Sequence, residues 1–399
     1  MEETIPHKKT RIKSIDFLRG IVMILMPLDH IRDFMSNSLY SPTNISHTTV
    51  GLFFTRYLAN YCAPIFIFLA GTSMYLWHQK IQSTKKVSAF LFSRGLFLIL
   101  LELTIIRTVW AFNFDLNFEL CQIFWAIGFS MIFLSVIIYL PYFWIFSIGI
   151  IIVAGHNLLD YVHLNTTGPF TWLFQVLHGP AETQIHFFKK LTFQIEDPLL
   201  PWIGVMSLGY IFGKLYTFEW KKRRNYLWLI GLISITCFVI LRLMNNYGNH
   251  LPWSVQKNGL FTFMSFINCE KYPPSLAFLL MYLGIAILSL ILLEKITGKI
   301  ADFFITFGKV PLAYYVVHVF YVHLIAVILA LITYGQASWL FGNHCLIGGI
   351  TDKFPQGYGY GLPIIYLIWF FVVITLYPFC KWYGNFKLKH KNIKFLRYI

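Results

Sequence analysis

The chain is poor in charge and lacks the motifs of several common enzyme classes. Only 12% of its 399 residues are charged, whereas soluble chains carry about a quarter. It contains no Walker loop, no Gly-x-Ser-x-Gly elbow, no His-Glu-x-x-His motif and no Cys-x-x-Cys pair. These absences argue against an ATP-driven pump, a serine hydrolase, a zinc protease and a dithiol redox site. No bound metal is expected.

Acidic residues are scarcer than basic ones, 17 against 32, which gives a formal net charge of +15. The basic residues gather in clusters at residues 8–13, 80–86, 221–224, 295–299 and 387–397. Basic clusters between membrane spans are typical of cytoplasmic loops. The excess is therefore interpreted as an orientation signal beside anionic lipid, and no nucleic-acid partner is expected.

Long apolar runs fill most of the remaining sequence, and about ten are long enough, or nearly so, to cross a bilayer. They lie at residues 15–35, 55–77, 87–110, 120–140, 142–157, 199–215, 226–244, 275–294, 303–333 and 362–379. The run 303–333 is overlong for one straight span, and Pro311 is predicted to break or bend it. We predict an all-α polytopic membrane bundle that forms one domain over residues 1–399.

The ten-span arrangement puts the basic clusters on one side, so both termini are predicted to be cytoplasmic. The first run has no small-residue cleavage site and is expected to remain as an uncleaved span. Three longer loops, 155–198, 245–274 and 334–361, fall on the opposite side. Long loops are often functional, and these are expected to fold over the outer mouth and bind an acceptor.

The first apolar run is the most informative segment because it carries six ionisable side chains. The six are Asp16, Arg19, Asp29, His30, Arg32 and Asp33. A charged group near the bilayer centre costs at least a few kcal/mol, and such groups usually face the bundle interior or a wet cavity. This helix is therefore predicted to line a functional site.

Arg19 and His30 are separated by eleven residues, or almost three helical turns. Both side chains therefore lie on one helix face, roughly 16 Å apart along the axis. Arginine suits phosphate and histidine suits proton transfer near neutral pH. An extended acyl-CoA fits such a face, with phosphates inward and thioester outward. Alternatively, Arg19 only reaches cytoplasmic headgroups and pairs with Asp16.

Three charged residues surround His30 in the sequence. Asp29 adjoins it, Arg32 lies two residues on and Asp33 three. A carboxylate beside a histidine raises its basicity and can fix its tautomer, and Asp33 is better placed on the helix to do so. The alternative is that Asp29, Arg32 and Asp33 form only a local ion network at the outer helix end.

Other spans contribute further polar candidates. Glu102 is expected near mid-membrane, where it needs a partner such as an arginine or must be protonated. Arg94 and Lys309 are candidates for phosphate contacts, although Lys309 could equally anchor to headgroups. His318 is deep in its span, where a structural role is more usual. His47, in the first outer loop, is the weaker alternative to His30 as a base.

The six cysteines form no zinc or redox motif. Cys269 and Cys345 both fall in predicted outer loops, where a disulfide between them is one alternative and free thiols the other. The remaining cysteines are expected to pack as small hydrophobic residues.

Several blocks spread over most of the chain match a family pattern. They are residues 14–20 with 28–34, 62–64 with 70–73, Arg94 and Gly95 with Glu102, 125–128, 201–206, and 308–312 with His318. The chain resembles the bacterial membrane proteins grouped with the heparan-alpha-glucosaminide N-acetyltransferase catalytic domain. The spacing from Arg19 to His30 is also similar to that of O-antigen-type membrane acyltransferases, where these residue types on the first span are implicated in acyl transfer.

The resemblance implies an acyltransferase that takes an acyl group, acetyl above all, from cytoplasmic acyl-CoA. The acceptor would be a hydroxyl or amine of an extracytoplasmic glycan or small molecule, and the location the bacterial inner membrane. The likeness also implies a homodimer. The human-type enzyme places its histidine in the loop after the first span, where this chain has Asn44 and His47. That spacing does not align cleanly, so His30 is the preferred base.

Two other function classes fit the same residues. Intramembrane Asp, Arg and His also suit a proton-coupled transporter of small molecules or lipids, although no repeated pair of broken helices is visible. A structural or sensor protein, in which the polar groups only lock helix packing, is the third.

Overall fold

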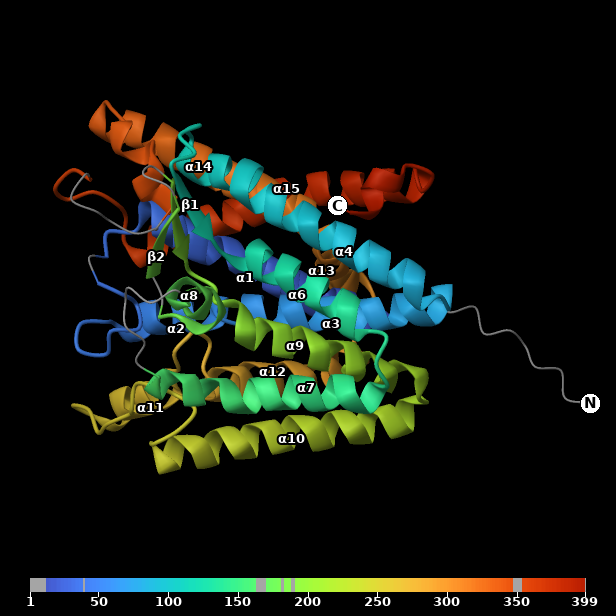
Figure 1. The fold of residues 1–399 in the computed structure, drawn as a ribbon. Coiled ribbons are helices and arrows are strands. Elements are labelled where there is room, and N and C mark those ends of the chain that lie inside the picture. Colours follow the sequence, from blue (N-terminus) through green and yellow to red (C-terminus); the bar gives the residue numbers. More distant parts are fainter. Residues whose placement is uncertain are drawn as a thin grey trace, which may run out of the picture.

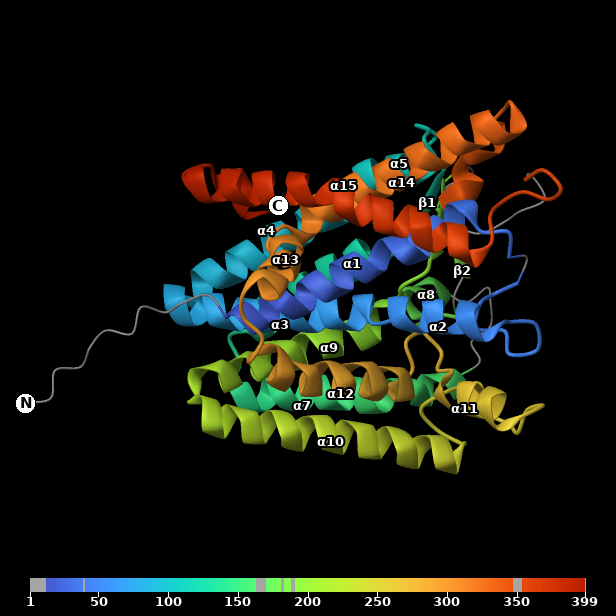
Figure 2. The ribbon, with the colours of Figure 1, turned by 180° about the vertical axis from the view of Figure 1, so that it is seen from behind.

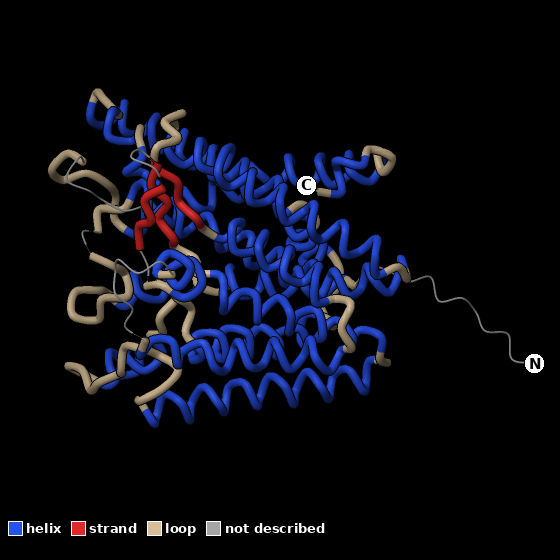
Figure 3. Tube along the Cα trace, viewed as in Figure 1, coloured by secondary structure: helices blue, strands red, loops and turns tan. Residues whose placement is uncertain are grey.

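The computed structural model describes residues 12–38, 40–162, 170–180, 183–187, 191–346 and 354–398. The predicted basic residues 8–11 lie outside these ranges. The described chain is mostly helical (Figure 3). The all-α membrane bundle predicted from the sequence is confirmed in class, while the count of ten spans and the cytoplasmic termini stay predictions.

Long helices run side by side along one axis (Figure 1). They are α1 (Lys13–Met35), α3 (Cys62–Ile81), α4 (Thr84–Leu101), α6 (Ile123–Ile137), α7 (Tyr142–Gly155), α9 (Leu199–Phe212), α10 (Trp220–Met244), α12 (Leu276–Leu293), α14 (Pro311–Tyr334) and α15 (Leu362–Lys389). Within the described ranges, eight helical stretches are long and apolar enough to cross a membrane. They do not include the charged α1 or the short α6.

Shorter elements complete the fold. They are α2 (Val50–Ala59), α5 (Arg107–Ala111), α8 (Thr171–His178), α11 (Gly259–Ile267) and α13 (Lys299–Gly308), with strands β1 (Phe118–Cys121), β2 (Thr183–Phe187) and β3 (Leu191–Ile195). The predicted run 303–333 is divided between α13 and α14. Pro311 occupies the first turn of α14, where its missing N–H costs nothing, so the predicted break at this proline is confirmed.

A small sheet at one end of the bundle was not predicted. β3 pairs in parallel with β1 and antiparallel with β2, giving the order β1-β3-β2. Leu120 and Cys121, placed by the sequence in a membrane span, belong to β1 instead. The sheet, α2, α8 and α11 gather at the same end of the bundle (Figure 1).

The opposite end of the bundle carries the start of α1 and the end of α15 (Figure 2). The short connections after α3 and α12 also lie there, and the basic residues of 80–86 and 295–299 lie in these connections or in the helix ends beside them. By the positive-inside rule this end is the predicted cytoplasmic side, and the sheet marks the predicted outer side.

Helices α3 and α9 pack unusually close together. A Cβ on Gly71 would lie 2.2 Å from the carbonyl oxygen of Met206, and one on Gly209 would lie 2.1 Å from that of Phe68. Only glycine allows this backbone contact, and small residues are the usual means of close helix approach in membranes. The small-residue patches in these two helices therefore serve packing.

Glu102 caps a neighbouring helix. The end of α4 continues into a π-helical turn, Glu102–Ile106. The Glu102 Oε2 atom accepts hydrogen bonds from the backbone N–H groups of Phe124 (2.7 Å) and Trp125 (3.2 Å), in the first turn of α6. The N-cap residue Gln122 makes no side-chain cap. Glu102 thus satisfies two N–H groups that the helix itself leaves unpaired. The described residues contain no ion pair to Glu102.

We expect Glu102→Leu to destabilise the protein because it leaves these two buried N–H groups without an acceptor. An unpaired buried donor costs about 1–3 kcal/mol. Glu102→Gln keeps a side-chain oxygen of the same reach and should cost less. Apparent melting temperatures in detergent measure both. Equal losses for the two variants would contradict the capping role.

Candidate functional site

A cavity of about 890 Å³ runs along the interior face of α1. Arg19 lines one end, and His30 lies further along the same wall, beside the outer mouth. This volume is in the range of ligand-binding pockets. The face predicted from the eleven-residue spacing is thus turned toward a shared cavity and away from lipid.

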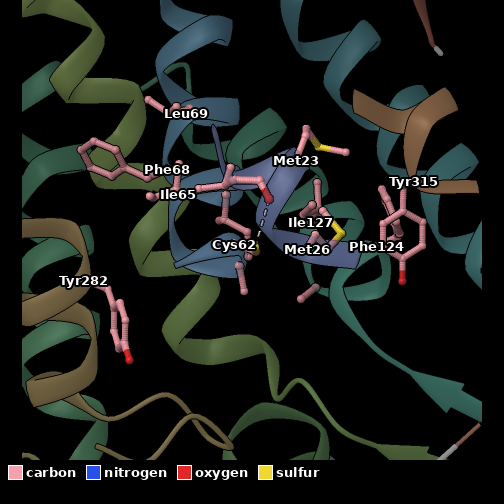
Figure 4. Close-up of a cluster of buried hydrophobic side chains, with 14 of the residues drawn as sticks. Met23, Met26, Cys62, Ile65, Phe68, Leu69, Phe124, Ile127, Tyr282 and Tyr315 are labelled. Carbon is pink, nitrogen blue, oxygen red and sulfur yellow. Dashed lines mark hydrogen bonds between the residues drawn. The ribbon is translucent and has the colours of Figure 1, made fainter. Parts of the chain in front are cut away.

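The middle of the cavity is apolar. Figure 4 shows the side chains that gather there: Met23 and Met26 from α1, Cys62 from α3, and Phe124 and Ile127 from α6. The Cys62 thiol donates to the Val22 carbonyl (3.3 Å), which ties α3 to α1. Between its two polar ends, the cavity therefore offers a hydrophobic passage.

Two arginines line the inner end. The Arg19 guanidinium donates to the Leu69 carbonyl (2.6 Å) and to the Ser73 hydroxyl, and lies 3.6 Å from Asp16. The predicted pairing with Asp16 is present, but Arg19 also faces the cavity. Arg94 from α4 lines the same end, and its Nε atom is buried without a hydrogen-bond partner among the described residues. Two neighbouring guanidiniums of which one has a spare donor suit an anionic group.

His30 is held by a second histidine. Its Nδ1 atom lies 2.8 Å from Nε2 of His318, which is fully buried on α14 behind the cavity wall. His318 Nδ1 lies 2.9 Å from the Tyr314 carbonyl oxygen, which can only accept. Trp110 and Tyr315 flank the His30 ring at 4.9 and 5.8 Å between centroids.

This chain of contacts fixes the tautomers. His318 carries its proton on Nδ1, so the Nε2 lone pair of the neutral ring accepts from His30 Nδ1–H. His30 is then left with an unprotonated Nε2. No described residue bonds that atom, and His30 lines the cavity. The geometry presents a lone pair that can accept a proton.

Asp29 and Asp33 bond to arginines. Asp29 Oδ1 accepts from Arg32 (2.8 Å), its Oδ2 accepts from Arg56 of α2, and Asp33 Oδ1 accepts from Arg32 (2.6 Å). Within the described ranges neither carboxylate bonds His30. The local ion network anticipated as the alternative is present, and it also fastens α2 to α1.

The other predicted candidates do not line the cavity. Lys309 is exposed at the junction between α13 and α14. His47 is exposed and stacks on Tyr40, with centroids 4.7 Å apart. Glu102 is occupied by the α6 cap. Asn44, in the same loop as His47, does line the cavity.

Five charged residues of the cavity were not singled out from the sequence. They are Arg56 on α2, Glu196 and Asp197 between β3 and α9, and Glu270 and Lys271 in the loop before α12. Asp197 lies directly before a predicted span, and Lys271 is a rare basic residue on the predicted outer side. These are weak signals, because acidic and basic residues beside a span are ordinary.

The alternative of a disulfide between Cys269 and Cys345 is wrong, because the two residues are not bonded to each other. Cys269 lines the cavity mouth, whereas the Cys345 thiol contacts the Trp339 carbonyl (3.6 Å). Within the described residues, no three His, Cys, Asp or Glu side chains gather closely enough to hold a metal ion.

Comparison with known proteins identifies the family of the chain. The family model for heparan-alpha-glucosaminide N-acetyltransferase, catalytic, matches residues 11–250, which is more than half of the chain. No curated protein matches the sequence. The matched region includes α1, α3, α4 and α6, which form much of the cavity wall. This chain is an integral membrane protein that belongs to the heparan-alpha-glucosaminide N-acetyltransferase catalytic-domain family.

Proposed function

We propose that the protein transfers an acyl group, most simply acetyl, from cytoplasmic acyl-CoA to a hydroxyl or amine of an extracytoplasmic glycan or small molecule. One observation carries the proposal: a single cavity joins the arginines at its inner end to the free His30 nitrogen near its outer mouth. We place the protein in a bacterial cytoplasmic membrane, with the sheet on the outer side.

The donor follows from the chemistry of the two ends. Arg19 and Arg94 suit the CoA phosphates, because guanidinium binds phosphate oxygens in pairs. The apolar middle suits the pantetheine arm and a short acyl chain. A cavity that follows α1 for roughly 16 Å between Arg19 and His30 lets the thioester reach the base while the nucleotide stays on the cytoplasmic side.

His30 then acts as the general base. The acceptor X–H attacks the thioester carbonyl carbon, and His30 Nε2 takes the acceptor proton. The C–S bond breaks, and the imidazolium returns that proton to the departing thiolate, which leaves as CoA–SH. Direct transfer from the thioester to the acceptor needs one base, and His30 is that base. In the alternative mechanism, His30 Nε2 first takes the acyl group and forms an acyl-histidine intermediate.

Asp29, Asp33 and Arg32 support this step indirectly. Their hydrogen bonds hold the outer turn of α1, and therefore the His30 ring, in place. The two carboxylates are not expected to accept the acceptor proton. The network also pairs the buried charges next to His30 with charges of opposite sign.

His30→Ala is expected to reduce acetyl transfer by about 10²–10⁴-fold, the usual contribution of a general base. Purified protein with radiolabelled acetyl-CoA and membrane glycans provides the assay. His47→Ala is the matched control, because that histidine is exposed outside the cavity, and it should retain activity. Transfer that survives His30→Ala removes His30 from the mechanism, while proton flux in liposomes without CoA binding would favour a transporter.

His318→Leu is expected to lower kcat by about 10–100-fold while leaving the KM for acetyl-CoA unchanged, because His30 loses the acceptor that fixes its tautomer. His318→Gln keeps a side-chain oxygen that can accept from His30 Nδ1–H and should recover part of the rate. If both variants keep full activity, the hydrogen bond between the two histidines has no catalytic role.

Arg94→Gln is expected to raise the KM for acetyl-CoA about 10–100-fold, which corresponds to the loss of one charged hydrogen bond. S-acetyl-pantetheine lacks the nucleotide phosphates, so its KM should respond little to the same change. The control is Lys309→Gln, whose exposed side chain lies outside the cavity. An equal effect on both donors would contradict a phosphate contact.

A further inference from the structure

The outer mouth of the cavity holds a carboxylate and an ammonium group that do not pair with each other. Asp197 and Lys271 both line the cavity together with His30. Among the described residues, no ion pair involves either side chain. The carboxylates beside His30 are different, because Asp29 and Asp33 are both occupied by arginines.

Asp197 is rigidly placed. It follows β3, and the backbone N–H groups of Glu196 and Asp197 both donate to the Cys121 carbonyl at the end of β1 (3.1 Å each). Trp202 Nε1, fully buried in α9, donates to Asp197 Oδ1 at 3.1 Å. The residue is only 4% exposed, and no described residue bonds Oδ2. One oxygen of a fixed carboxylate is therefore left for the cavity.

Lys271 belongs to a loop that is fastened over the mouth. Asn268 Nδ2 donates to the Thr43 carbonyl (3.0 Å), and the Glu270 N–H donates to Asn249 Oδ1 (2.8 Å). The Lys271 ammonium lies 4.7 Å from the Tyr272 ring centroid. No described residue accepts a hydrogen bond from it. The Lys271 ammonium, with its three N–H donors, therefore lines the cavity without a described hydrogen-bond acceptor.

Burial makes the charged forms of Asp197 and Lys271 energetically unfavourable. Burial raises the pKa of Asp197 to about 6, although the nearby Lys271 ammonium opposes the rise. Burial, with the charge of Arg56, lowers the pKa of Lys271. The other titratable or charged groups facing Asp197 are Arg56, Glu102, Glu196, Tyr272 and Tyr315. A buried charge without a partner is costly unless something hydrogen-bonds it.

We infer that Asp197 and Lys271 form the acceptor subsite, a role that rests on the proposed acyl transfer. Asp197 Oδ2 accepts an O–H or N–H of the acceptor, and Lys271 Nζ donates to a neighbouring oxygen. The acceptor therefore carries at least two adjacent polar groups, as in a diol or an amino alcohol within a saccharide. A simple alcohol fills only one of the two positions.

The test is the kinetics of Asp197→Asn. Asparagine keeps an oxygen for the Trp202 N–H but offers the cavity an amide donor in place of the carboxylate oxygen. The apparent KM for the acceptor should rise about 10–100-fold, with the KM for acetyl-CoA unchanged. The acceptor probes are glucosamine and glucose, with cyclohexanol as the probe that has one hydroxyl.

The pH profile separates binding from a structural effect. In the wild type, Asp197 gains its proton as pH falls through about 6, so the acceptor KM should rise there, and in Asp197→Asn it should stay flat. Glu119→Gln is the matched control. Burial also raises the pKa of that carboxyl, to about 7, but it lies outside the cavity lining. The control should keep the wild-type profile.

Lys271→Met tests the second contact. It should raise the KM for glucosamine and glucose and leave that for cyclohexanol unchanged, because cyclohexanol has no second oxygen to accept from the ammonium. A wild-type acceptor KM and pH profile in Asp197→Asn, or an equal effect of Lys271→Met on all three probes, overturns the inference while leaving the proposed function intact.

A labelling experiment makes the subsite testable without turnover. Water-soluble carbodiimide with glycine methyl ester modifies accessible carboxyls, and peptide mass spectrometry reports modification of Asp197. Glucosamine or glucose should protect Asp197, while cyclohexanol should not. If the wild type transfers acetyl to none of the probes, the proposed function fails for these probes, and the protection experiment alone tests the acceptor subsite. If neither sugar protects Asp197, the inference of an acceptor subsite is overturned.

Discussion

The cost of burying charge determines how α1 is built. Each ionisable side chain on this helix has to be paired, hydrogen-bonded or wet, because none can face hydrocarbon at a tolerable free energy. Asp16 lies beside Arg19, and Asp29 and Asp33 share Arg32, with Arg56 completing the pairing. These partners come from α1 and α2, so the same interactions that satisfy charge also fix the wall of the cavity.

The other helices of the bundle hold the cavity wall in position. Close contact between α3 and α9 through Gly71 and Gly209 leaves room for the cavity on the other side of α3. The Glu102 cap fixes the start of α6, which supplies Phe124 and Ile127 to the apolar middle. The small sheet then sets Asp197 at the mouth. Helix packing thus builds the passage, and the outer elements build its opening.

The sequence predicted what depends on local spacing and missed what depends on distant partners. The shared face of Arg19 and His30, and the pairs Asp16–Arg19 and Asp29–Arg32, follow from helical periodicity alone. The partner of His30 is 288 residues away, and no local pattern identifies it. The pairing of β1 with β3 joins Phe118 to Thr192 and is equally non-local. Asp197 and Lys271 become notable only once that sheet and the outer loop bring them to the cavity.

Comparison with two buried histidines outside the cavity shows what suits His30 to proton transfer. His323 lies between the Val109 and Leu340 carbonyls (3.0 and 2.7 Å), and His156 Nε2 faces the Pro274 carbonyl (2.9 Å) while its Nδ1 faces α7 carbonyls. Both nitrogens of each ring therefore face backbone carbonyl oxygens, and neither is directed into the cavity. His30 uses one nitrogen for orientation and keeps the other for the cavity. A base needs this division, because a ring enclosed at both nitrogens has no lone pair that a substrate can reach and a ring held at neither has no fixed direction.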